Sequence, residues 1–193
     1  MAGVPVIDTG PMTVEEFYAF TDTRPDEEKW ELIDGEPVLN ASPSKLHQRI
    51  VKNIIFELVK FEQVPGVSWE VLPSLGVRVS DVQRPEPDVL IIPKNLTASD
   101  PFERDRNDVI VAFEVLSPST VSRDLRWKRA AYTSLSGLSH YVVIAQDAVD
   151  VVVFDRTRGF EERHLRSLNE EVQFPALRAV LPLAEIYRDT GLV

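Results

Sequence analysis

Uninterrupted apolar runs mark the middle of the chain. Residues 89–92 read Val-Leu-Ile-Ile, and residues 109–116 are apolar except for one glutamate. Runs of this kind are typical of strands that are covered on both faces of a sheet. Two more apolar runs, at 140–145 and 149–154, are separated by a short acidic turn and predict a hairpin.

The flanking patterns predict helices. Thr13 is a suitable N-cap for a short helix at 14–21, and Ser42 followed by Pro43 predicts the start of a helix that extends to Gln63. Another helix is expected from Asp124 to Ser136. The remaining expected elements are a hairpin at 30–39 with an Asp34-Gly35 turn, strands at 67–72, 76–79, 159–168 and 171–174, a polar loop at 94–107, and a final helix at 183–188.

These elements predict a single α/β domain at residues 13–193, preceded by an N-terminal tail at 1–12. Short apolar strands interspersed with helices are typical of a mixed central β-sheet flanked by helices on both faces. No internal repeat and no glycine-rich phosphate loop interrupts this pattern.

Two carboxylate residues occur at the central apolar runs of the sequence. Asp88 directly precedes the first run, and Glu114 lies inside the second. A buried carboxylate must be paired, hydrogen-bonded or bound to a metal, because desolvating it alone is costly. Side chains alternate along a strand, so Glu114 is expected on the face opposite to Phe113 and Val115.

A lysine lies on the apolar face of the helix that follows. Successive residues of an α-helix are rotated by roughly 100°, which places mostly apolar side chains of this helix in one sector. Lys128 lies in the middle of that sector. A cation belongs there only if an anionic group receives it. The residues of this sector are Asp124, Leu125, Lys128, Ala131, Tyr132 and Leu135, whereas Arg123, Arg126 and Arg129 fall outside it.

The amino-acid composition limits the classes of function that this chain can have. The chain has no cysteine, which excludes disulfides, thiolate zinc sites and thiol catalysis. No apolar segment approaches the length of a membrane span, and the first ten residues lack a signal-peptide pattern, so a cytoplasmic protein without membrane contact is expected. The net charge of −10 argues against a general nucleic-acid binder but is compatible with a local basic surface.

Together, these motifs resemble the PD-(D/E)XK nuclease superfamily, and more closely a bacterial family of restriction-endonuclease-like proteins with a domain of unknown function. The resemblance spans residues 12–154 and rests on the order and spacing of its motifs. In the superfamily a lysine follows two residues after the acid, where this chain has Leu116, and the resemblance implies that Lys128 replaces it. The matching motifs are Trp30 to Glu36, Ser42-Pro43-Ser44 with His47, Pro87-Asp88, Glu114 to Thr120, and Lys128 with Tyr132.

The resemblance implies a restriction-endonuclease-like fold and a metal-dependent endonuclease that hydrolyses DNA. Asp88, Glu114 and the Val115 carbonyl are the implied ligands of Mg²⁺, with Mn²⁺ as substitute, and oxygen ligands suit both ions. Asp88, Glu114 and Lys128 are then the catalytic candidates. A homodimer is expected, because two active sites are needed to cut both strands of a duplex.

Several roles stay open in the sequence. Glu31 is either an additional acid at the site or a solvent-facing strand glutamate, which the local pattern favours. His47 is either an accessory site residue or a hydrogen-bonded core histidine, and Ser117 and Tyr132 are further accessory candidates. The three arginines outside the helix sector, Arg123, Arg126 and Arg129, either bind nucleic acid or form a solvated helix face.

A non-catalytic function is the competing hypothesis. Lys128, Glu114 and Asp88 could form a buried salt-bridge network without chemistry, in a dimeric binding or scaffold module that retains the nuclease fold. The position of Lys128 separates the two hypotheses. A lysine that reaches an open space between Asp88 and Glu114 favours catalysis, and a sealed trio favours the module.

Overall fold

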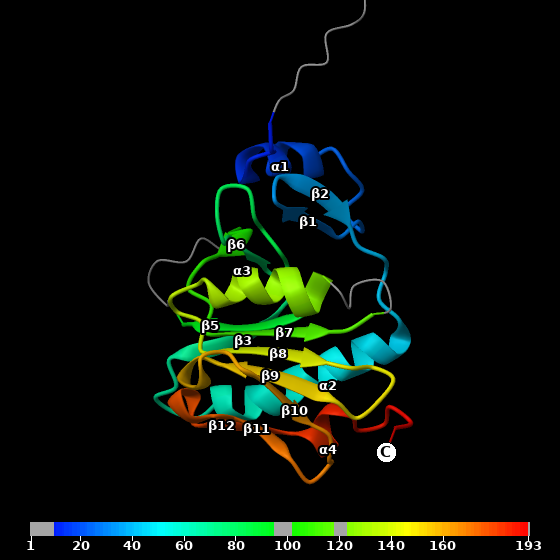
Figure 1. The fold of residues 1–193 in the computed structure, drawn as a ribbon, viewed down its shortest axis with the longest axis vertical. Helices are drawn as coiled ribbons and strands as arrows, with labels where there is room; N and C mark the ends of the chain where they lie inside the picture. Colours follow the sequence, from blue (N-terminus) through cyan, green and yellow to red (C-terminus); the bar gives the residue numbers. More distant parts are fainter. Residues whose placement is uncertain (1–9, 95–101, 118–122, 193) are drawn as a thin grey trace, which may run out of the picture.

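The centre of the molecule is a six-stranded sheet with the strand order β10-β9-β8-β7-β5-β3. The computed structural model describes residues 10–94, 102–117 and 123–192. Neighbouring strands are antiparallel except β7 and β8, which are parallel, so the sheet is mixed as predicted (Figure 1). The strands are β3 (Trp69–Pro73), β5 (Val89–Pro93), β7 (Val111–Val115), β8 (His140–Ile144), β9 (Val151–Asp155) and β10 (Glu162–Leu165).

Helices cover both faces of this sheet, which explains its continuous apolar strands. On one face, the long helix α2 (Lys45–Glu62) packs with the short helix α4 (Leu183–Ile186) and the hairpin of β11 (Glu171–Phe174) and β12 (Ala179–Pro182). On the other face lie the π-helical segment η1 (Arg123–Lys128) and α3 (Arg129–Thr133) (Figure 1). Two short 3₁₀ segments complete the C-terminal half, η2 (Arg156–Arg158) and η3 (Pro175–Leu177).

The predicted alternation along β7 is confirmed. Phe113 and Val115 are buried in the cluster that contains α2, whereas Ala112 is buried in the cluster on the α3 face. Glu114, two residues after Ala112, therefore points to the α3 face. Phe113 anchors the opposite face through an edge-to-face contact with Phe174, at 5.8 Å between ring centroids.

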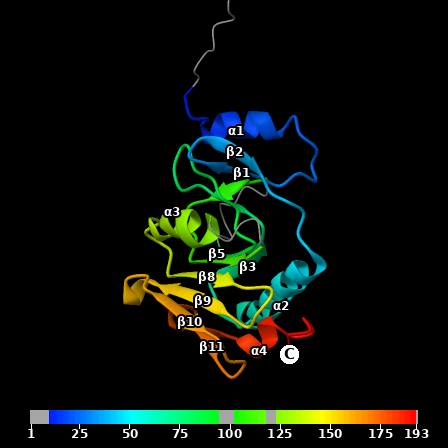
Figure 2. The same ribbon diagram turned by 45° about the vertical axis from the view of Figure 1, so that its right-hand side comes forward.

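A smaller layer lies at one end of the sheet (Figures 1 and 2). The predicted hairpin is present. Its turn residues, Asp34 and Gly35, both have positive φ, at 50° and 82°, as a two-residue turn of this kind requires. Leu32 and Arg84 exchange backbone hydrogen bonds of 3.1 and 2.8 Å, which tie the hairpin to the segment before β5. The layer consists of α1 (Val14–Thr21), β1 (Trp30–Ile33), β2 (Glu36–Leu39), β4 (Gly76–Val77) and β6 (Asp105–Arg106).

Several predicted helix boundaries are wrong, including the end of the final helix, which is Ile186 in α4 rather than residue 188. The N-cap of α2 is Ser44 rather than Ser42, because the Ser44 hydroxyl accepts the His47 backbone N–H at 3.1 Å and also bonds Gln146 at 3.0 Å. The helix predicted from Asp124 to Ser136 begins one residue earlier and is π-helical before it becomes α-helical, and it ends at Thr133.

Other differences are at the periphery. Strand β12 was not predicted, and β6 lies within the expected polar loop. Residues 95–101 of that loop, residues 118–120 of the motif from Glu114 to Thr120, and residues 1–9 of the expected tail lie outside the described residues. The division into tail and domain stays a prediction, although Met12 already donates a 3.0 Å hydrogen bond to Gly35. Among the described helices, none combines the length and apolarity needed to cross a membrane.

Candidate active site

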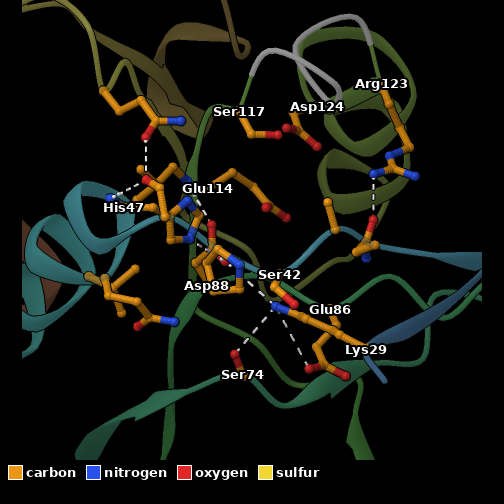
Figure 3. Close-up of a pocket in the computed structure, with 18 of the residues that line it drawn as sticks. Lys29, Ser42, His47, Ser74, Glu86, Asp88, Glu114, Ser117, Arg123 and Asp124 are labelled. Carbon is orange, nitrogen blue, oxygen red and sulfur yellow. Dashed lines mark hydrogen bonds and ion pairs between the residues drawn. The ribbon is translucent and has the colours of Figure 1, made fainter. Parts of the chain in front are cut away.

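A cavity of about 490 Å³ opens where β5 begins and β7 ends (Figure 3). The start of α2 and the segment η1 form its other walls. Its lining is rich in carboxylates, and it holds all three of the predicted catalytic side chains. The titratable residues that line it are Glu27, Lys29, His47, Glu86, Asp88, Glu114, Arg123, Asp124 and Lys128.

Asp88 directly precedes β5 and is held by donors on both of its oxygens. Its Oδ2 accepts the Val115 backbone N–H at 2.8 Å, and its Oδ1 lies 3.1 Å from His47 Nε2 and 3.5 Å from Lys29 Nζ. Burial alone would raise the pKa of Asp88, but the His47 hydrogen bond, the Lys29 charge and the Val115 N–H together lower it. Asp88 is therefore a stable carboxylate.

Glu114 lies in the next strand and has a different environment. Its Oε1 accepts hydrogen bonds from Lys128 Nζ at 2.8 Å and from the Tyr132 hydroxyl at 3.1 Å. Burial raises the pKa of Glu114 well above its ordinary value; the Lys128 charge lowers it, and the carboxylates of Asp124, Asp88 and Glu31 raise it. Glu114 therefore holds its proton far more readily than an exposed glutamate.

Lys128 is buried and contacts Glu114 as predicted, and it has two further carboxylate partners. Its Nζ lies 2.8 Å from Glu114, 2.8 Å from Glu31 and 3.5 Å from Asp124, with 4% of the side chain exposed. Burial would lower the pKa of Lys128, and the three carboxylates raise it above its ordinary value instead. The salt bridge from Lys128 to Asp88, which the competing hypothesis of a non-catalytic network includes, is not among the described contacts, and Asp88 instead pairs with His47 and Lys29.

Glu31 is not the solvent-facing strand residue that the local pattern favours. It is fully buried, and besides Lys128 it accepts hydrogen bonds from the Glu86 backbone N–H at 2.7 Å and from Asn40 Nδ2 at 2.9 Å. Burial opposes ionisation, but Lys128 and these donors lower the pKa of Glu31. Glu31 thus carries the negative charge that balances Lys128.

Some of the residues predicted as accessory or nucleic-acid-binding line the cavity, and others do not. His47 and Ser117 line the cavity, and Tyr132 is buried against Glu114. Arg123 also lines it and donates to Asn40 Oδ1 at 2.6 Å. Arg129 does not line the cavity.

Arg129 donates to the Phe160 carbonyl at 2.9 Å and lies over the Phe154 ring, which makes it a structural contact of α3. Arg126 is exposed on η1 and is not part of the cavity lining. Of the three predicted arginines, only Arg123 therefore faces the cavity.

Sequence reasoning missed four residues of this site. Asp124 shares the helix sector of Lys128, and that position could have identified it as a partner. Lys29, Asn40 and Glu86 have no such signal, because none of them lies in a described helix or strand. The packing of the β1–β2 hairpin against the sheet brings Lys29 and Asn40 to the cavity, and Glu31 of β1 binds the Glu86 backbone N–H there.

The donor atoms fit a hard divalent cation. Among the described residues, no group of three or more histidine, aspartate or glutamate side chains is arranged to hold a metal. Asp88 and Glu114 supply two carboxylates, and the Val115 carbonyl leaves the strand on the same side as its N–H, which points to Asp88. Magnesium sites of this kind complete their shell with water and substrate phosphate.

The fold places the protein among restriction-endonuclease-like α/β proteins. A matching solved structure is described as the crystal structure of a "putative nuclease belonging to DUF820" from Anabaena variabilis ATCC 29413. The likeness has a TM-score of 0.73 at 17% identity and covers 92% of this chain and 98% of the other. At this identity it shows the fold alone.

A family model shows the family itself. Residues 14–187 match the model described as "Uma2: Putative restriction endonuclease", and the chain therefore belongs to this family. The resemblance inferred from the motifs is confirmed at the level of family and fold. No curated protein matches the chain.

Replacing Glu114 by glutamine is expected to stabilise the protein in a pH-dependent way. Because the pKa of Glu114 is higher in the folded state than its ordinary value of 4.5, this residue stabilises the fold of the wild-type protein at pH values below 4.5. That stabilisation is lost as the pH rises towards the pKa of the folded state. The advantage of Glu114→Gln over wild type should therefore grow between pH 5 and pH 7, to about 1–3 kcal/mol. Urea unfolding measured across this range tests it.

Glu36→Gln, at an exposed position of β2, controls for the loss of one charge. A difference between Glu114→Gln and wild type that stays constant or shrinks towards pH 7 would mean that Glu114 ionises normally.

Proposed function

We propose that this protein is a metal-dependent endonuclease that hydrolyses phosphodiester bonds in DNA. The family and the fold support a nuclease. The observation that carries the proposal is the pairing of Asp88 and Glu114, from adjacent antiparallel strands, in one cavity beside a buried lysine. Oxygen ligands for a metal ion, together with a fixed positive charge, suit the hydrolysis of a phosphodiester.

The proposed ligands of Mg²⁺ are Asp88, Glu114 and the Val115 carbonyl, with Mn²⁺ as substitute. The bound ion would supply a water of lowered pKa and would neutralise charge on the scissile phosphate. The protein contributes the orientation of these ligands. His47 and the Val115 N–H fix Asp88, whereas Lys128 and Tyr132 fix Glu114.

Lys128 supplies a permanent positive charge at the edge of the cavity. Glu31 and Asp124 hold its ammonium within 3.5 Å, so its position is set before the substrate arrives. In this proposal Lys128 orients the attacking water through Glu114 and stabilises negative charge that develops on the phosphate. Ser117 and Arg123, which line the same cavity, contact the adjoining phosphates.

The substrate is proposed to be DNA despite the net charge of −10. The arginine side chain of Arg123 gives the cavity wall a local cation, and the exposed Arg126 extends this charge along η1. Since non-specific affinity scales with the phosphates neutralised, a small basic surface predicts weak binding outside the active site.

One observation favours the competing hypothesis of a non-catalytic binding or scaffold module. The side chain of Lys128 is only 4% exposed, and its ammonium is surrounded by three carboxylates, as in a structural salt-bridge network. Such a network would persist without any chemistry. Asp88, whose side chain is 12% exposed and lines the cavity, favours catalysis.

A nicking assay on supercoiled plasmid, with linear and single-stranded DNA in parallel, separates these two functions. Wild type with Mg²⁺ or Mn²⁺ should cleave, and Asp88→Asn, Glu114→Gln and Lys128→Met should each lose about 100-fold or more in rate. Asp147→Asn, in the exposed turn between β8 and β9, should cleave like wild type. Absence of cleavage by wild type on every substrate and with both metals supports the module.

We also propose that the protein acts as a homodimer, which would align two sites on opposite strands of a duplex. Sedimentation equilibrium should then give twice the chain mass of 21.8 kDa. A mass equal to that of one chain at micromolar concentration contradicts the dimer. The expected cytoplasmic location stays a prediction.

A further inference from the structure

Lys29 places an ammonium group beside Asp88, and sequence reasoning gave it no role. It lies immediately before β1, and its Nζ is 3.5 Å from Asp88 Oδ1, 3.9 Å from Glu86 Oε1 and 3.4 Å from Ser74 Oγ. Figure 3 shows its side chain extending to Asp88, with Ser74 and Glu86 next to its ammonium. These contacts are long for charge-assisted hydrogen bonds.

The surroundings of Lys29 differ from those of Lys128. The Lys29 side chain is 30% exposed, whereas that of Lys128 is 4% exposed and is held by two contacts of 2.8 Å. Among the described residues that line the cavity, Lys29 has the most exposed cationic side chain, since Arg123 is 21% exposed and is bound to Asn40. The ammonium of Lys29 can therefore leave its partners at little cost.

Space for such a movement lies next to it. Lys29 lines the active-site cavity and also a second cavity of about 360 Å³, lined by Tyr18, Trp30 and Arg104 among others. Ser74 and Glu86 likewise line both cavities, so the two adjoin at Lys29. A nucleic-acid strand that enters the first cavity passes this ammonium.

We propose that Lys29 is a DNA-binding residue that a divalent cation releases from Asp88. This inference rests on the proposed nuclease function. A divalent cation and an ammonium repel each other at the same carboxylate oxygen, so the metal and Lys29 compete for Asp88. Once released, Lys29 binds a backbone phosphate of the substrate.

The proposal makes two linked predictions for Lys29→Met. Without DNA, Mg²⁺ affinity measured by calorimetry should rise about threefold to tenfold, because a competing cation is gone. With DNA, binding should weaken only when a divalent cation is present. Ca²⁺, which prefers the same oxygen ligands, replaces Mg²⁺ in these binding measurements.

Salt dependence identifies the phosphate contact directly. The slope of log K against log salt should be smaller in Lys29→Met than in wild type by about 0.9 with Ca²⁺, the value for one phosphate contact on duplex DNA, and unchanged in EDTA. Lys29→Arg should restore the slope. Lys60→Met removes a lysine on α2 that lies outside both cavities, with 51% of its side chain exposed, and should change neither quantity.

Outcomes for Lys29 and for the nuclease are distinguishable. If wild type binds metal and cleaves DNA but Lys29→Met matches Lys60→Met in slope and metal affinity, Lys29 is only a structural ion pair and this proposal is wrong. A slope reduced equally with Ca²⁺ and in EDTA also contradicts it, because release by the metal is then unnecessary. Failure of wild type itself to bind metal or DNA overturns the proposed function and this inference together.

Discussion

The buried ammonium of Lys128 is the constraint on which the site depends. Its desolvation has to be offset by anionic partners, and these come from three separate elements, β1, β7 and η1. Through Glu31 of β1, Lys128 therefore links the smaller layer to the central sheet at the edge of the cavity. Replacing a buried ion network by apolar side chains of similar volume is often neutral or stabilising, so stability alone does not account for this network.

The same network gives two adjacent acids different protonation behaviour. Asp88 faces donors and keeps a lowered pKa, whereas Glu114 is buried among other carboxylates and has a raised pKa. One lysine cannot balance Glu31, Glu114 and Asp124 together. The excess of negative potential is a reason for a cation to enter the cavity, and its entry would drive the proton from Glu114.

Local patterns predicted those parts of the fold and the site that depend on periodicity. The apolar runs identified β5 and β7 and placed Asp88 and Glu114 in neighbouring strands, and the helix sector placed Lys128 inside. The partner of Lys128 could not be predicted in this way. Glu31 reaches it only because the hairpin packs over the end of the sheet, and a four-residue strand carries no information about that packing.

Local ambiguity explains the other differences. Ser42 and Ser44 are equally suitable caps in sequence, and the contact of Ser44 with the distant Gln146 distinguishes them. The π-helical geometry of η1 leaves the same inward residues buried as an α-helix would, so periodicity did not reveal it. Lys29 lies outside any periodic element, which is why its contact with Asp88 emerged only from the structure.

The most direct measurement is calorimetric titration of Mg²⁺ and Mn²⁺ into wild type and Asp88→Asn, with and without a short DNA duplex. Buffers of different ionisation enthalpy report protons released on binding. The account predicts saturable binding to wild type, release of up to about one proton from Glu114 per metal, and loss of binding in Asp88→Asn. Absence of saturable binding to wild type, with and without DNA, would contradict a metal site at these acids.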